Sequence, residues 1–195
     1  MIKDMAIHFR PCLAKTFAGL FITMAILFHP SNGNSQVTDT ATSHKIKAAY
    51  LYNFLKFVTW PESVYAKGHN DITICLYGRN SLGSFFEPLS TKKAQGRSIN
   101  IRYINQLSES EVCQMIFIGS SEANNISRII DTLANTSCLT VGETKQFAAH
   151  GGMIGFIQDQ NRIKLEINAH AAKQAQIQIS AKLLEVAKII YGEEK

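Results

Sequence analysis

The chain has 195 residues, of which 46% are hydrophobic and 18% are charged. This composition excludes an intrinsically disordered chain, a collagen-like or coiled-coil fibre and a polytopic membrane protein. The length suits one well-buried core rather than two. Lys and Arg number 20 against 15 Asp and Glu, and the four cysteines are too few for a disulfide-dense miniprotein.

The N-terminal segment has the pattern of a secretory signal. Lys3, Arg10 and Lys15 precede an apolar run at residues 17–28, and small polar residues follow at 31–35. A membrane anchor is the alternative, but an anchor needs about 20 apolar residues to cross the bilayer, and this run is shorter. We therefore expect export to the periplasm with removal of the signal, by cleavage after Gly33 or after Ser35.

This interpretation divides the chain into a signal peptide at residues 1–35, a flexible mature N-terminus at 36–43 and a single domain at 44–192. Without residues 1–35 the chain keeps 17 basic and 14 acidic residues, a formal charge of +3. The densest basic cluster, Lys92-Lys93 with Arg97 nearby, is typical of a solvated loop. We therefore expect no nucleic-acid partner.

The mature chain alternates apolar helix and strand patterns. Ser43 is a suitable N-cap for a helix that runs to about Thr59, and Trp60-Pro61 ends this helix because proline lacks the amide hydrogen that a continuing helix needs. Apolar runs and alternation predict strands at residues 72–77, 98–104, 114–118 and 138–141, with a short helix at 81–86 and a longer one at 121–133.

The C-terminal third begins with a predicted hairpin, in which residues 153–158 and 162–167 flank the turn Asp159-Gln160-Asn161. Ser180 then caps a predicted helix whose apolar stripe extends to Ile190. Strands separated by helices favour an α/β fold, with a mostly parallel sheet flanked by helices on both faces and an antiparallel C-terminal hairpin at its edge.

The mature chain contains three cysteines, Cys75, Cys113 and Cys138, which allow three single disulfide pairings. If the strands at Cys75 and Cys113 are neighbours, these two form the natural bridge, and Cys138 is left as a small buried side chain. The histidines have no ligand spacing and there is no C-x-x-C motif. We therefore expect neither a metal nor another cofactor.

Catalytic signals are weak. The amides of Gly119, Ser120 and Ser121 lie between a strand and a helix, where they could bind an anion, although a capped strand-to-helix turn is the alternative. The glycines of His150-Gly151-Gly152 suit a backbone role, and His170 suits a structural or interface role. No nucleophile elbow and no pair of carboxylates stands out, so we expect that the protein is not an enzyme.

Five stretches form an ordered set along the mature chain: 47–61 (KAAYLYNFLKFVTWP), 72–78 (ITICLYG), 113–119 (CQMIFIG), 151–168 (from GGMIG to EIN) and 179–184 (ISAKLL). The set resembles the YfiR-like family of exported bacterial proteins. The resemblance implies a periplasmic α/β domain without known catalytic activity, often a homodimer. It also implies the disulfide Cys75–Cys113, while a second disulfide of the family has no counterpart here.

The resemblance further implies a repressor that binds the periplasmic sensor domain of a membrane diguanylate cyclase and so lowers cyclic di-GMP and biofilm formation. An outer-membrane OmpA-like lipoprotein is the implied second partner. A nucleotide or an aromatic amino acid is an implied ligand, and His170 is a residue that could match the ligand pocket.

The alternative function is a periplasmic receptor for a small ligand, with a partner unrelated to cyclic di-GMP. For a repressor, Tyr50, Phe54 and Trp60 are the candidate partner-binding residues if part of the first helix is exposed. The opposing interpretation is that these rings fill the core, with Trp60 at the helix end as the expected exception.

Overall fold

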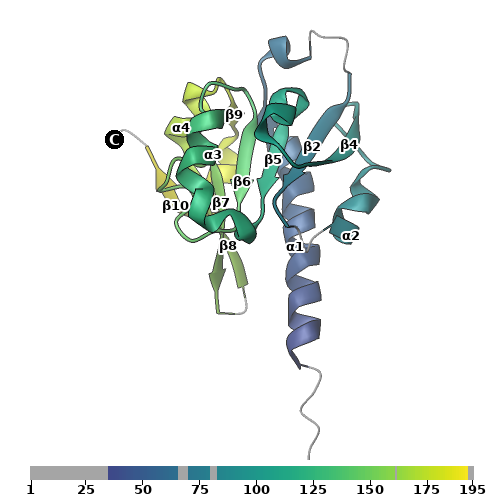
Figure 1. Cartoon of the computed structure of the whole chain (residues 1–195), viewed down its shortest axis with the longest axis vertical. Helices are drawn as coiled ribbons and strands as arrows, with labels where there is room; N and C mark the ends of the chain where they lie inside the picture. Colours follow the sequence, from purple (N-terminus) through teal and green to yellow (C-terminus); the bar gives the residue numbers. More distant parts are fainter. Residues whose placement is uncertain (1–34, 66–69, 80–82, 161, 193–195) are drawn as a thin grey trace, which may run out of the picture. The chain divides into compact units, whose positions relative to one another are not determined.

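The computed structural model describes residues 35–65, 70–79, 83–160 and 162–192. The expected signal peptide, residues 1–35, lies outside this part of the chain except for Ser35. The first described element is the long helix α1 (Ser35–Phe57), which lies along one face of a sheet (Figure 1). Within the described residues, no helix has the length and apolar character needed to cross a bilayer.

An eight-stranded sheet forms the centre of the fold, with the strand order β10-β8-β7-β6-β5-β2-β4-β3. Its strands are β2 (Ile72–Tyr77), β3 (Lys93–Ala94), β4 (Arg97–Ile104), β5 (Met115–Ile118), β6 (Leu139–Gly142), β7 (Ile154–Asp159), β8 (Arg162–Asn168) and β10 (Ala187–Tyr191). Neighbours are parallel except for the pairs β7–β8 and β3–β4. A separate antiparallel pair joins β1 (Val58–Thr59) to β9 (Gln178–Ile179).

The remaining helices are short. They are α2 (Gly83–Phe86), α3 (Ile126–Leu133), α4 (Ala169–Gln174) and α5 (Ala181–Leu184), together with the 3-10 turns η1 (Glu62–Val64), η2 (Glu87–Leu89), η3 (Leu107–Val112) and η4 (Ser120–Asn125). Because successive residues of a strand point to opposite faces, β2 and β5 contribute to two apolar cores. Leu51, Phe54 and Leu55 of α1 pack into the first core, while Ile126, Ile129 and Leu133 of α3 pack into the second.

This arrangement confirms the predicted fold class, a mostly parallel sheet with helices on both faces and an antiparallel hairpin. The hairpin, however, is not at the edge of the sheet. Strand β10 lies outside β8 and pairs with it in the parallel direction. Figure 1 shows β10 beside β8 and β7, at one border of the sheet.

Two expectations about local structure are wrong. Residues 36–43, expected to be irregular, belong to α1, because no proline or glycine interrupts the chain from residue 35 to 57 and a helix extends readily once nucleated. The predicted C-terminal helix ends at Leu184, and residues 187–191 form β10. The β-branched pair Ile189-Ile190 favours a strand, and the free edge of β8 provides its hydrogen bonds.

Cys75 in β2 and Cys113 just before β5 form a disulfide, with their Cα atoms 5.8 Å apart. The parallel pairing of β2 with β5 brings the two cysteines together. Cys138 is unpaired and buried, and its burial raises the pKa of its thiol. No group of His, Cys, Asp and Glu in the described residues could hold a metal ion.

Candidate functional site

A cavity of about 750 Å³ lies beside the loop that follows β6, against β7, β8 and β10. Three other grooves in the described part of the chain are smaller, with volumes of about 400, 360 and 250 Å³. A small molecule fits a space of this volume. Its wall combines two carboxylates with apolar and aromatic groups: Glu143, Glu166, Phe156, Ile157, Ile189 and Tyr191.

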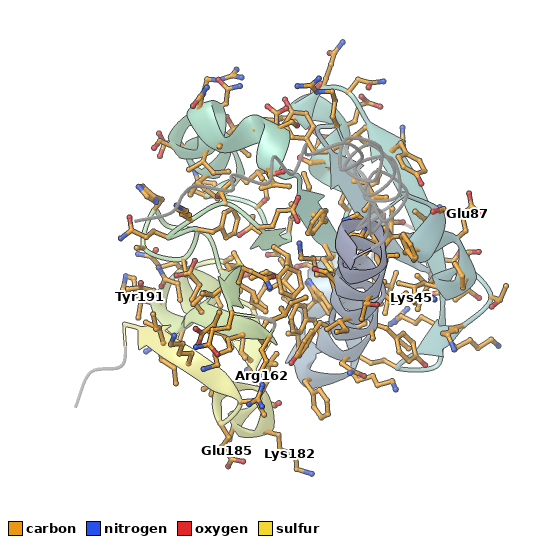
Figure 2. The ribbon with its side chains drawn as sticks, turned by 90° about the horizontal axis from the view of Figure 1, so that it is seen from below. Lys45, Glu87, Arg162, Lys182, Glu185 and Tyr191 are labelled. Atoms are coloured by element: carbon orange, nitrogen blue, oxygen red, sulfur yellow. A yellow bond between two sulfur atoms is a disulfide. The ribbon has the colours of Figure 1, made fainter. Side chains whose placement is uncertain are left out.

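The carboxylate of Glu166 is the most unusual group in this wall, because only 2% of the residue is exposed. Its Oε1 atom accepts a hydrogen bond from the Ala148 amide at 3.2 Å, and its Oε2 atom lies 3.5 Å from the Tyr191 hydroxyl. Burial and the negative charge of Glu166 raise the pKa of Tyr191. Figure 2 shows Tyr191 on β10, at the border of the sheet.

Glycines make room for this arrangement. Gly155 pairs directly with Glu166 across β7 and β8, and a Cβ atom on Gly155 would overlap the Glu166 side chain. In the same way, a Cβ atom on Gly142 or Gly152 would overlap the buried ring of Phe147. The glycines around residue 152 therefore have the backbone role that their sequence pattern indicated.

Glu143 lies at the carboxyl end of β6 and joins three elements. Its Oε2 atom is 2.7 Å from Nζ of Lys47 in α1, and its Oε1 atom accepts a hydrogen bond from the Ser120 amide at 3.1 Å. The side chains of Lys47 and Glu143 are only 14% and 13% exposed. This partly buried ion pair ties α1 to the carboxyl ends of β5 and β6.

Replacing Lys47 by methionine is expected to lower the free energy of unfolding by about 2 kcal/mol, between the values typical of exposed and buried pairs. The reason is that Glu143 would keep its negative charge in a partly buried position without the positive charge of Lys47. Urea unfolding followed by circular dichroism measures the change. Lys164→Met is the matched control, because the ion pair of Lys164 with Asp159 is at the surface, with side chains 41% and 32% exposed. Its loss should lower the free energy of unfolding by less than about 1 kcal/mol. Equal losses in the two variants would contradict this.

The predicted anion site at Gly119, Ser120 and Ser121 makes its contacts within the chain. The Ser120 amide donates to Glu143, so a carboxylate of the protein itself stands where an anionic ligand was considered. The Gly119 amide donates to the Tyr77 carbonyl at 3.0 Å, and the Ser121 hydroxyl accepts from the Arg79 amide at 2.9 Å. The alternative of a strand-to-helix turn accounts for these contacts.

His170 lies elsewhere. It is exposed near the start of α4 and borders a smaller cavity of about 250 Å³, with Thr140, Met153 and Gln174. The structure therefore does not bring His170 together with Gly119, Ser120 and Ser121 in one pocket. The large cavity escaped the sequence analysis because its residues come from four separate segments and carry no motif.

The aromatic residues of α1 are mostly interior. Phe54 is fully buried, and Tyr50 is half-buried against the rings of Phe54 and Phe156, at 6.1 and 6.0 Å. The expectation that Trp60 is exposed is wrong: 3% of it is exposed, and its indole N–H donates to the Gln114 carbonyl at 2.7 Å. Phe57, 36% exposed, is the ring at the surface near the helix end.

Two solved structures are similar to this chain at low sequence identity. A conserved domain protein from Vibrio cholerae O1 biovar El Tor str. N16961 is 14% identical, with a TM-score of 0.49 over 67% of this chain and 60% of that one. The ABC domain from Streptococcus pneumonia in complex with L-Trp is also 14% identical, with a TM-score of 0.48 over 62% of this chain and 55% of that one. This chain thus covers less than two thirds of either structure.

Sequence comparison gives the family. No curated protein matches the chain. The model of the YfiR/HmsC-like family matches residues 44–188, and this confirms the resemblance seen in the five stretches. The chain therefore belongs to the YfiR/HmsC-like family, whose members are non-catalytic regulators of the periplasm.

Proposed function

We propose that this protein represses an inner-membrane diguanylate cyclase by binding the periplasmic sensor domain of the cyclase, and so limits cyclic di-GMP and biofilm formation. Membership of the YfiR/HmsC-like family over residues 44–188 is the observation that supports it. In this proposal residues 1–35 direct export and are removed, and residues 44–192 form the regulatory domain. The protein acts as a homodimer. An OmpA-like outer-membrane lipoprotein relieves repression by sequestering the repressor.

Repression by binding needs a preference for the inactive cyclase, not a chemical step. A 100-fold higher affinity for the inactive than for the active cyclase corresponds to a difference of about 2.7 kcal/mol in binding free energy. A few well-placed side chains supply a difference of that size, so a modest surface is sufficient.

The groove between α1 and the α2–η2 segment is our candidate for this surface. It has a volume of about 400 Å³ and an apolar floor that includes Phe85 and Leu89. The Nζ atoms of Lys56 and Lys92 lie 4.1 and 5.4 Å from the centre of the Tyr52 ring, and Lys45 borders the same groove. A lysine-bordered apolar groove is complementary to an acidic, amphipathic segment of a partner.

The charges near this groove are mostly positive. In the described part of the chain no ion pair joins Lys45, Lys56 or Lys92 to a carboxylate. Figure 2 shows Lys45 on α1 and one acid, Glu87, on the neighbouring segment. Uncompensated cations around an apolar floor favour association with an acidic partner and steer its approach.

The test is the cellular level of cyclic di-GMP, measured by mass spectrometry in the native host. Deletion of the gene is expected to raise cyclic di-GMP and biofilm mass, and the wild-type gene should restore both. An unchanged level after deletion would refute repression.

The groove is tested in the same strain. Lys45→Glu with Lys92→Glu is expected to leave cyclic di-GMP as high as in the deletion strain, at equal amounts of exported protein. The control is Lys173→Glu with Lys182→Glu, which reverses two exposed lysines on α4 and α5 and should repress normally. Full repression by the groove variant would contradict the proposed role of the groove and indicate that the sensor domain binds another surface of the protein.

The second candidate function is a receptor for a small ligand, and the cavity of about 750 Å³ with its buried Glu166 is the observation that favours it. A receptor of this kind could also be a repressor whose affinity for the cyclase depends on the ligand.

A further inference from the structure

The carboxylate of Glu166 is buried without a cation. In the described residues, the acidic partners of ion pairs are Glu143, Glu109 and Asp159, so no Lys, Arg or His nitrogen lies within 4.0 Å of the Glu166 carboxylate. A buried carboxylate without a countercharge is costly, and proteins usually place a cation or several strong donors beside it.

The two oxygen atoms of Glu166 differ in their surroundings. Oε1 accepts from the Ala148 amide at 3.2 Å, whereas among the described residues Oε2 has one hydrogen-bond partner, the Tyr191 hydroxyl, at the long distance of 3.5 Å. Oε2 therefore has room for a further and stronger donor. The donor that best satisfies a buried carboxylate is a charged N–H group.

The rest of the wall suits an apolar body attached to that donor. Ile157 and Ile189 provide apolar surface, and Glu143 already has its cation in Lys47. Lys145 also borders the cavity, but it is exposed, so water screens its charge more than a buried charge is screened. The buried carboxylate of Glu166 therefore lacks one compensating positive charge in this cavity.

We propose that this cavity binds a small organic cation, an ammonium group on an apolar body, with the ammonium beside Oε2 of Glu166 and the apolar body against Ile157 and Ile189. The proposal rests on the second candidate function and names its ligand class. It is independent of the cyclic di-GMP measurements, so either proposal can fail while the other stands.

A purely structural role for Glu166 is the competing explanation, since its Oε1 atom holds the loop at Ala148. The loop has another attachment, because Nδ2 of Asn168 donates to the Ala148 carbonyl at 3.0 Å. Glu166→Gln keeps the oxygen that faces Ala148 and removes the charge. This variant therefore separates the structural role from the electrostatic one.

The probes are phenethylamine and phenethyl alcohol, which have similar shapes and differ in charge. Binding to the mature, disulfide-bonded protein is measured by calorimetry and by the rise in unfolding temperature. The amine is expected to bind about tenfold more tightly than the alcohol. In Glu166→Gln, the affinity for the amine should fall to the affinity for the alcohol. Glu185→Gln, which changes an acid that projects outward after α5 in Figure 2, should bind like the wild type.

A second variant guards against loss of folding in Glu166→Gln. Ile189→Trp narrows the cavity and leaves the carboxylate in place, so it should abolish binding of both probes. Its control is Val112→Trp, because Val112 and Ile189 are 37% and 38% exposed and Val112 lies on η3, away from the cavity. Equal affinity for the two probes, no binding of the amine at millimolar concentration, or a preference for the amine that survives in Glu166→Gln would each overturn the proposal.

Discussion

Replacing both Cys75 and Cys113 by alanine is expected to lower the free energy of unfolding by about 4 kcal/mol. The bridge joins residues 38 positions apart, and it restricts the unfolded chain more than the folded one. In the folded state the two cysteines are 0% and 5% exposed, between β2 and the start of β5. The bridge therefore ties β2 to the segment that leads into the neighbouring strand β5.

Urea unfolding of the protein without residues 1–35 measures this loss. The wild-type protein in a reducing agent should unfold at a urea concentration close to that of the double variant. Cys138→Ala is the matched control, because Cys138 is 2% exposed but unbridged. It removes a small buried side chain and should cost about 1 kcal/mol. If the double variant unfolds at the wild-type urea concentration, the disulfide does not contribute as argued.

Trp60→Ala is expected to lower the free energy of unfolding by about 3–5 kcal/mol, the range for truncating a buried aromatic residue. The indole fills the first core at the end of α1, and its N–H donates to the Gln114 carbonyl at 2.7 Å. The side chain of Gln114 accepts from the Thr73 amide at 2.7 Å, so the contact also supports the start of β2.

Two further variants separate packing from hydrogen bonding. Trp60→Phe keeps most of the ring and removes one of the two donors to the Gln114 carbonyl, which still accepts from the Leu139 amide at 2.9 Å. It should therefore cost about 1 kcal/mol. Phe57→Ala changes a ring that is 36% exposed and should cost clearly less than Trp60→Ala. Similar losses for Phe57→Ala and Trp60→Ala would contradict the assignment of Trp60 to the core.

Repeating patterns along the chain predicted the elements whose surroundings are uniform. The largely apolar run Ile72–Tyr77 is a strand with the predicted bounds, because both faces of β2 are covered and most of its positions favour an apolar residue. The hairpin of β7 and β8 was also predictable, since alternation and a polar turn are local signals. Pro61 correctly predicted that the first helix ends before it.

Patterns failed where a distant segment decides the local structure. The stripe that ends at Ile190 fits a helix as well as a strand, and the open edge of β8 selects the strand. The two-residue strand β3 (Lys93–Ala94) has no sequence signal of its own, and it forms because β4 is beside it.

The sequence by itself determined the family, the mostly parallel α/β fold and the separation of apolar from polar positions, because these depend on residues that are close in the chain. The tertiary structure alone decided that Trp60 is buried, that Glu143 accepts from the Ser120 amide and that Glu166 lines a cavity without an ion-pair partner among the described residues. The physical reason is that burial and charge pairing depend on groups brought together from distant segments. A single side chain in the sequence does not specify those partners.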